Sequence, residues 1–438
     1  MVDVTGPVGM AMGGYGARVG GAIGIHDPLH VRTLVLDDGV TCLVLAICDF
    51  VGVDRAIADG ARRLIDHELG IPAQNVCVAA THTHSGPLTV RSRESPEYFT
   101  WAARKVADSV SLALDSMQDV ALKVASAELS TISQNRRHPD GPIERVLKVL
   151  LAAPQGGGEH VATVVNYACH ATVLEHDNLL YSADFPGAAA TLVEHALGGT
   201  CIYMQGACAN INPAWMRHDF REVDRIGGIV GAAAIRTAHE LRPLGETQSC
   251  INLSWSEELP VEPAPGVLLG DVSFAAAHTF VDLPYRSMPA LSEIESEIAR
   301  LQSQIDALSP GDLVARRELQ PQLNQLRIDR TTKARHPDVG ATTRRLEIQA
   351  FRLSPDAMVV MLPGEFFVQT GKDIEKRCGI DHVFICCYAN DYAGYFAPAS
   401  EFPRAGYEVG SSRFESTAAE AIADAAVALV QSLRGSAP

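Results

Sequence analysis

Three segments of the chain repeat one order of apolar and polar positions. In each, runs rich in Val, Ile, Leu and Cys lead to an acidic residue followed by Phe, and then to a stretch whose apolar residues are spaced by three and four. A second apolar run closes the segment and ends in a polar loop. The segments cover residues 31–87, 160–213 and 344–395. This alternation predicts an α/β fold of mixed β-sheets, largely buried and flanked by helices.

Residues 288–335 depart from this pattern. Their first apolar positions alternate spacings of three and four, which is typical of an amphipathic helix with a narrow seam; they are Leu291, Ile294, Ile298, Leu301, Ile305 and Leu308. Ser-Pro-Gly-Asp at 309–312 breaks this helix, and leucines at 313, 319, 323 and 326 indicate a second one. We therefore expect a single domain over residues 1–438 with a helical hairpin inserted at 288–335. The hairpin would be either a subunit contact in a homo-oligomer or an active-site lid.

Composition and charge narrow the classes of partner. Apolar residues make up 47% of the chain, enough for a large core, and the formal net charge of −16 argues against nucleic acid and anionic membranes. No apolar run approaches the ~20 residues that cross a bilayer, and the N-terminus does not read as a signal peptide. The ten cysteines form no C-x-x-C pair, which favours free thiols. We expect a cytoplasmic protein that acts on a small molecule.

The sequence GGYGARVGG at residues 13–21 suggests a dinucleotide-binding loop at first sight. Gly14, Gly16 and Gly20 do not have the spacing of G-x-G-x-x-G, and no predicted strand precedes them. We interpret the stretch as a loop that needs backbone freedom.

Histidines stand where two of the apolar runs end. His82 and His84 lie two residues apart in THTHSGP, and the period of a strand would place both imidazoles on one face, within reach of one site. His170 follows the apolar run in NYACHAT. Each histidine can be read as a metal ligand or as an ordinary buried polar residue.

Oxygen donors end the third segment. Glu365 in PGEFF follows a strongly apolar strand, where a carboxylate is costly unless it is paired or bound to a cation. Tyr392 and Tyr395 in YANDYAGY lie near the next strand end, and they would otherwise be core or rim residues. Together with the histidines, a carboxylate and an oxygen donor from separate strand ends match the ligand set of a catalytic zinc.

These motifs resemble the neutral/alkaline (non-lysosomal) ceramidase family. The resemblance rests on THTHSGP, NYACHAT with SADFPG, PGEFF and ANDYAGY, together with GYG and GIHDPLHVRTLVL near the N-terminus, and it spans most of residues 8–415. It implies a zinc centre held by two histidines, a glutamate and a tyrosine. Those ligands are His82, His170, Glu365 and Tyr395 in this sequence.

The resemblance also implies groups around the zinc. His84 matches a neighbouring histidine of the family, and Tyr407 in AGYEVGSS matches a tyrosine beyond the ligands. Arg136 in QNRRHP matches a substrate-binding arginine, with Arg137 as the adjacent candidate.

Two departures from the family pattern affect the expected substrate. The family's Gly-Asp-Val-Ser-Pro motif reads ANINP at 209–213, which puts Asn210 at the aspartate position and Asn212 at the essential serine position. Asparagine cannot be a hydroxyl nucleophile, although its amide N–H can support an oxyanion. The chain also ends soon after the last motif, so we expect it to lack the family's C-terminal immunoglobulin-like domain. We therefore expect a shorter, water-soluble substrate in place of ceramide.

The resulting prediction is a zinc-dependent hydrolase that cleaves an amide (N-acyl) bond of a small soluble substrate through a metal-activated water. His84 would transfer a proton or orient the water. Arg136, Asn212 and Tyr407 would stabilise the oxyanion or hold a substrate carboxylate or hydroxyl. The sequence leaves open an esterase or lactonase with the same centre, and a catalytically silent relative that binds a ligand.

Overall fold

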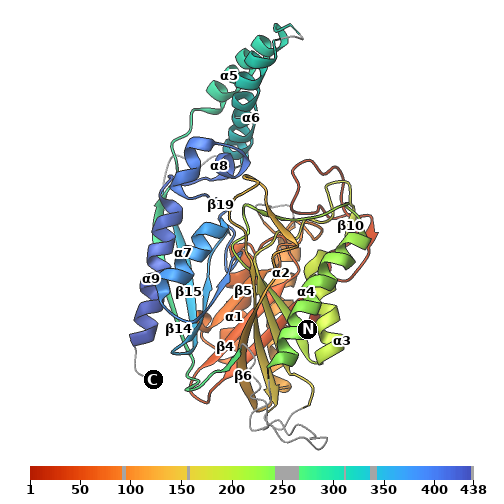
Figure 1. The fold of residues 1–438 in the computed structure, drawn as a ribbon, viewed down its shortest axis with the longest axis vertical. Helices are drawn as coiled ribbons and strands as arrows, with labels where there is room; N and C mark the ends of the chain where they lie inside the picture. Colours follow the sequence, from red (N-terminus) through yellow and green to blue (C-terminus); the bar gives the residue numbers. More distant parts are fainter. Residues whose placement is uncertain (91–94, 155–157, 242–265, 310–311, 336–342, 436–438) are drawn as a thin grey trace, which may run out of the picture.

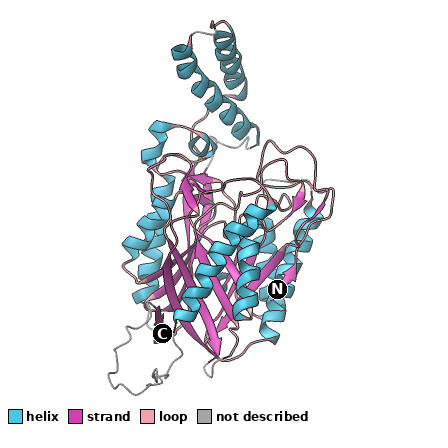
Figure 2. Cartoon of the chain, turned by 45° about the vertical axis from the view of Figure 1, so that its right-hand side comes forward, coloured by secondary structure: helices cyan, strands magenta, loops and turns pink. Residues whose placement is uncertain are grey.

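The computed structural model describes residues 1–90, 95–154, 158–241, 266–309, 312–335 and 343–435. Three main sheets form its centre (Figure 2). The first has the order β1 (Val2–Asp3), β3 (His30–Asp37), β4 (Cys42–Cys48) and β5 (Val76–Ala80). The second has the order β11 (Thr200–Gln205), β9 (Ala162–Tyr167), β8 (Val146–Pro154), β6 (Val120–Glu128) and β13 (Gly266–Leu268). The third has the order β14 (Ala275–Pro284), β15 (Thr343–Ser354), β16 (Ala357–Met361) and β18 (His382–Cys386).

Short strand pairs and helices complete the fold. The pairs are β2 (Gly24–Ile25) with β10 (Leu180–Tyr181), β7 (Ser133–Asn135) with β12 (Ile211–Pro213), and β17 (Glu365–Phe366) with β19 (Tyr395–Phe396). The helices are α1 (Arg55–Leu69), α2 (Pro96–Asp115), α3 (Asp184–Leu197), α4 (Phe220–Glu240), α5 (Leu291–Asp306), α6 (Leu313–Arg335), α7 (Val368–Cys378), α8 (Tyr407–Ser411) and α9 (Ala418–Gly435), with 3₁₀ turns η1 (Ala73–Asn75) and η2 (Ala399–Arg404). Among the described helices, none combines the length and apolar character needed to cross a lipid bilayer.

The three segments that share one sequence pattern fold into three similar units. In each unit two antiparallel strands are followed by a helix and by a third strand parallel to the second. The units are β3–β4–α1–β5, β8–β9–α3–β11 and β15–β16–α7–β18. The predicted α/β class, with mixed sheets, flanking helices and an inserted helical hairpin, is confirmed.

Alternate residues of β4 enter two different cores. Leu43, Leu45 and Ile47 belong to a central cluster to which all three main sheets contribute. Val44 and Ala46 point the other way, into the larger cluster that includes the apolar faces of the helices. Because both faces of the strand are buried, its sequence is a continuous apolar run, CLVLAIC, instead of an apolar–polar alternation.

The central cluster also brings the three units together. Strand β11 of the second unit contacts β4 of the first and β18 of the third. A polar residue stands within four positions of the end of the second strand of each unit: Asp49 after β4, His170 after β9 and Glu365 after β16. The loops after these strands and after β5, β11 and β18 therefore meet at one end of the central core.

Helices α5 and α6 form an arm that extends from the body beside α8 (Figure 1). The apolar seam predicted from the sequence lies between the two helices: Leu301, Ile305 and Leu323 are buried against one another, with Ile298 and Leu326 packed around them. The seam thus holds the two helices of one chain together. At the base of the arm, α6 packs against α8.

Replacing Leu323 with aspartate should separate the two helices of the arm. Leu323 is fully buried in the seam, and a carboxylate has no partner there. We expect hydrogen exchange of the α5 amides to rise steeply. Asn324→Asp, at the exposed neighbouring position, is the matched control and should leave exchange unchanged. Retained protection of α5 in Leu323→Asp would show that the seam does not hold the arm together.

Candidate metal centre

His82 and His84 are brought together by a turn beyond strand β5. The strand ends at Ala80, and His82 has a φ of 66°, in the left-handed region that few non-glycine residues occupy. The Nε2 atoms of the two rings lie 3.1 Å apart, and both side chains are buried. The two imidazoles are therefore close together, as predicted, but the alternation of side chains along a strand is not the reason. A strained turn places the two rings, and such strain often marks a functional site.

His170 enters the same cluster from the second unit. Thr83 forms a parallel bridge with Ala171, which sets the two histidine segments side by side. The Nδ1 atom of His170 donates to the carbonyl of Cys208 at 2.6 Å, and Nδ1 of His82 donates to the carbonyl of Val51 at 2.6 Å. Because a carbonyl only accepts, both rings carry their proton on Nδ1 and present the lone pair of Nε2 to the cluster. This is the usual orientation of a metal-binding histidine.

Glu365 supplies an anionic oxygen to the cluster. Its Oε2 atom lies 3.6 Å from Nε2 of His82 and 3.4 Å from Nε2 of His170. Its Oε1 atom accepts a hydrogen bond from the hydroxyl of Tyr392. Burial opposes ionisation of the carboxyl, but His82, His170 and the Tyr392 hydroxyl outweigh it and lower its pKa to about 2. Glu365 is therefore a carboxylate at any ordinary pH.

The buried donors fit a cation. Among the described residues, Nε2 of His170 and Oε2 of Glu365 have no hydrogen-bond partner although both atoms are buried. The separations of 3.1 to 3.6 Å between donor atoms in this cluster compare with about 3.4 Å between tetrahedral ligands ~2.1 Å from a zinc. His82, His84 and His170 by themselves form a buried group whose ligand atoms lie within 4.8 Å of one another. Two donor sets thus share two histidines, one completed by Glu365 and the other by His84.

The histidines are neutral, as metal ligands must be. Burial lowers the pKa of His82 to about 3, although the charge of Glu365 opposes the shift. Burial also lowers the pKa of His84 well below its usual value, with the neighbouring His82 and His170 adding to the effect. For His170, burial and the positive charge of Arg136 lower the pKa.

Tyr395 and Arg136 lie beside the cluster. Strand β17 pairs in parallel with β19 so that Glu365 is opposite Tyr395, which puts both side chains on one face. Nη2 of Arg136 donates to the Tyr395 hydroxyl at 3.2 Å, and its Nη1 lies 3.4 Å from Oδ1 of Asn212. Burial raises the pKa of Tyr395 well above its usual value, helped by Glu365 and opposed by Arg136.

The two candidate arginines have different contacts. Arg136 is the one that contacts Tyr395, whereas Arg137 donates to Glu401 at 3.1 Å, to Glu408 at 2.6 Å and to the carbonyl of Ala405. Arg136 also donates to Glu408, through Nε at 2.7 Å. Glu408 therefore holds both guanidinium groups in place. The sequence analysis did not identify Glu408, although it directly follows the candidate residue Tyr407.

Asn210 and Tyr407 have different surroundings. Asn210 accepts from the backbone N–H of Val368 at 2.9 Å and donates to Gln369, so it holds the start of helix α7. Tyr407 is half-exposed, and its ring meets that of Tyr395 edge-on at 5.6 Å between centroids. Of the predicted site residues, Tyr407 lies at the rim and the others lie inside.

The glycine-rich loop, read from sequence only as a flexible segment, covers His84. A Cβ built on Gly14 would lie 2.5 Å from Cγ of the His84 ring, and Gly14 has a φ of +98°. The ring of Tyr15 meets the His84 ring edge-on at 4.9 Å, and Nη2 of Arg18 donates to the His84 carbonyl at 2.8 Å. The loop thus covers the His84 ring and fixes its position. Only glycine fits at position 14.

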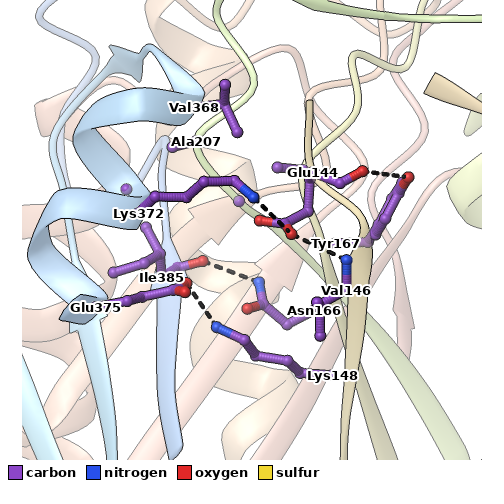
Figure 3. A pocket seen from close by; sticks show the side chains of 13 residues that line it. Glu144, Val146, Lys148, Asn166, Tyr167, Ala207, Val368, Lys372, Glu375 and Ile385 are labelled. Atoms are coloured by element: carbon purple, nitrogen blue, oxygen red, sulfur yellow. Dashed lines mark hydrogen bonds and ion pairs between the residues drawn. The ribbon is translucent and has the colours of Figure 1, made fainter. Parts of the chain in front are cut away.

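A small crevice between β8, β9 and α7 is unsuited to a substrate (Figure 3). Its free space of about 10 Å³ is that of a single water molecule. Lys148 pairs with Glu375 at 2.5 Å, and Lys372 pairs with Glu144 at 3.5 Å. Because opposite charges pair within it, the crevice joins the second unit to α7 and has no excess charge to attract a ligand.

Comparison with known proteins gives consistent matches. Residues 1–211 match the family described as neutral/alkaline non-lysosomal ceramidase, N-terminal. A curated neutral ceramidase of Pseudomonas aeruginosa is 25% identical over 472 aligned positions, which cover 94% of this chain and 68% of that protein. The crystal structure of neutral ceramidase from Pseudomonas aeruginosa matches with a TM-score of 0.75 at 22% identity, covering 99% of this chain and 73% of that one. A structure described as ceramidase complexed with C2 matches with a TM-score of 0.73 at 21% identity, over 99% and 74%.

Proposed function

Since this chain is related to the neutral/alkaline non-lysosomal ceramidases, as its motifs predict, we propose that it is a metal-dependent hydrolase that cleaves an amide bond. The observation that carries the proposal is the convergence of unpaired, buried acceptors: Nε2 of His170 and Oε2 of Glu365 lie 3.4 Å apart, with Nε2 of His82 beside them. Neutral imidazoles and a carboxylate are the donors that zinc prefers, and we propose zinc as the metal.

We assign separate roles in amide hydrolysis to the residues around the centre. A zinc held there would supply an acidified water molecule and polarisation of the scissile carbonyl. His82, His170, Glu365 and Tyr395 are the proposed ligands. Nε2 of His84 faces His82 at 3.1 Å and is the nitrogen that we assign to holding and moving a proton. Arg136 contacts Tyr395 and Asn212 through its two Nη atoms, and we propose that it donates to the carbonyl oxygen as that oxygen gains charge.

We propose a small N-acyl compound as the substrate. Asn212 stands at the family's serine position and offers no hydroxyl nucleophile, which supports attack by water. The rim of the site is polar: a cavity of about 480 Å³ lies beside Arg136 and Tyr407, with charged side chains on its walls. These charged walls suit a polar head group better than a long apolar chain.

A panel of matched short amides and esters tests this function. We expect release of the acyl acid from the amides, loss of that activity after chelation, and its return with zinc. Hydrolysis of the esters alone would replace the amidase proposal by an esterase. A protein that neither takes up a transition metal nor hydrolyses any member of the panel would contradict the proposed function.

Substituting alanine at Gly14 should lower the turnover rate without loss of metal. The new Cβ meets the His84 ring at 2.5 Å, so the ring must shift, and small displacements of a proton-transfer group are costly. We expect kcat to fall at least roughly tenfold with metal content unchanged. Gly9→Ala is the matched control, because Gly9 has the same φ of +98° but nothing within 4 Å of its Cβ position. Equal loss in both variants would attribute the effect to backbone strain alone.

A further inference from the structure

The cavity at the rim of the metal centre carries an excess of positive charge. It is lined by Arg136, Arg137, His138, Arg404, Ala405, Gly406, Tyr407 and Glu408. Three of these residues are arginines, and the carboxylates that face them are those of Glu408 and Glu401. The three arginines and these two carboxylates together leave one positive charge, in a chain whose formal net charge is −16.

Arg404 is the arginine of this cavity whose charge is least neutralised by carboxylates. The guanidinium groups of Arg136 and Arg137 are engaged by Glu408 at 2.7 and 2.6 Å. Arg404 reaches Glu401 only at 3.5 Å and His138 at 3.2 Å, in both cases through Nη1, and its side chain is 61% exposed. Glu401 is already held by Arg137 at 3.1 Å. Arg404 is therefore oriented at the cavity wall but only weakly neutralised.

The cavity shares Arg136 with the groups that we assign to the reacting carbonyl. Arg136 lines it and also donates to the Tyr395 hydroxyl, and Tyr407 lines it and meets the Tyr395 ring at 5.6 Å. A substrate with its carbonyl at Tyr395 and Arg136 would extend its head group past Tyr407 toward Arg404. A single excess positive charge matches a monoanion, and a carboxylate presents the two oxygens that a guanidinium binds.

We infer that this cavity, with Arg404 on its wall, is a subsite for the carboxylate of the substrate, so that the substrate class is the N-acyl amino acids. The inference rests on the proposed amidase function and specifies its substrate. Glu401 and Arg137 hold the floor of the subsite, and Arg404 sets the preference for an anion over a neutral head group.

N-hexanoylglycine and N-hexanoylglycinamide, which differ only in the carboxylate, provide the test through release of hexanoate. We expect the wild type to prefer the acid, and Arg404→Gln to raise the KM for the acid roughly tenfold, the effect of one charge-assisted contact, while the KM for the amide is unchanged. Arg404→Lys should restore part of the preference. Arg236→Gln is the control, because Arg236 is equally exposed, at 63%, and lies on the remote helix α4.

Calorimetric titration of N-hexanoylglycine separates this inference from the proposed function. Arg404-dependent binding by a protein that hydrolyses neither compound would contradict the amidase and keep the subsite. Hydrolysis of both compounds, with KM values that Arg404→Gln leaves unchanged or alters equally, would keep the amidase and overturn the subsite.

Discussion

His170→Ala should remove both the bound metal and the hydrolytic activity. The imidazole is fully buried, and its Nδ1 atom is held by the Cys208 carbonyl so that Nε2 points at Glu365. Loss of residues that merely support a ligand lowers metal affinity roughly 10- to 100-fold, and loss of a ligand itself should exceed this. Elemental analysis of purified protein, beside hydrolysis of short amides, measures the two effects together.

Two further variants make this result specific. Glu365→Gln preserves the shape of the side chain and removes its charge, so we expect the same loss of metal with little change in fold. His195→Ala replaces an exposed histidine on α3 and should retain metal and activity. Full metal content in His170→Ala and Glu365→Gln would show that the protein binds its metal at another site.

Arg136→Gln should lower kcat on the order of 10²- to 10³-fold, the usual cost of removing a donor to a developing oxyanion. Its guanidinium is the group that spans the Tyr395 hydroxyl and Asn212. Glu408, the carboxylate left behind, keeps its contact with Arg137 at 2.6 Å, so the fold should survive. Because the lost interaction belongs to the transition state, KM for a neutral amide should change far less than kcat.

Arg62→Gln is the control for loss of a buried ion pair. Arg62 pairs with Glu347 at 2.7 Å, the same distance as Arg136 with Glu408, but it does so between α1 and β15. We expect it to lower stability and leave kcat unchanged. Arg137→Gln should affect kcat less than Arg136→Gln. A kcat equal to that of wild type in Arg136→Gln would exclude this guanidinium from the reaction.

Local pattern predicted the architecture because most of it is local. Each unit is a strand pair, a helix and a strand adjacent in sequence, and apolar periodicity reports such elements directly. His170 and Glu365 stood out as candidates because a polar group soon after a buried strand is costly without a partner, and the family resemblance assigned both of them as ligands. The apolar seam of the arm was also predicted from the sequence, but the pattern left open whether the hairpin is a subunit contact or an active-site lid.

The contacts that complete the site could not be read in this way. His82 approaches His84 because its own backbone is in the left-handed conformation, which the apolar pattern of a strand does not predict. Gly14 looked like a flexible position, and its constraint comes from a ring about 70 positions later in the sequence. The pairing of Glu408 with both arginines likewise depends on helix α8 meeting the loop that follows strand β7. Such contacts join residues far apart in sequence, and periodicity contains no information about them.

The meeting of three units at one end of the core has a consequence for assembly. His82 comes from the first unit, His170 from the second and Glu365 from the third, so no fragment that lacks one unit can hold a metal with this donor set. Contacts of such high sequence separation form late, after the individual units. Retention of the proposed metal would therefore report whether almost the entire chain has folded, and its release on titration with denaturant should coincide with global unfolding.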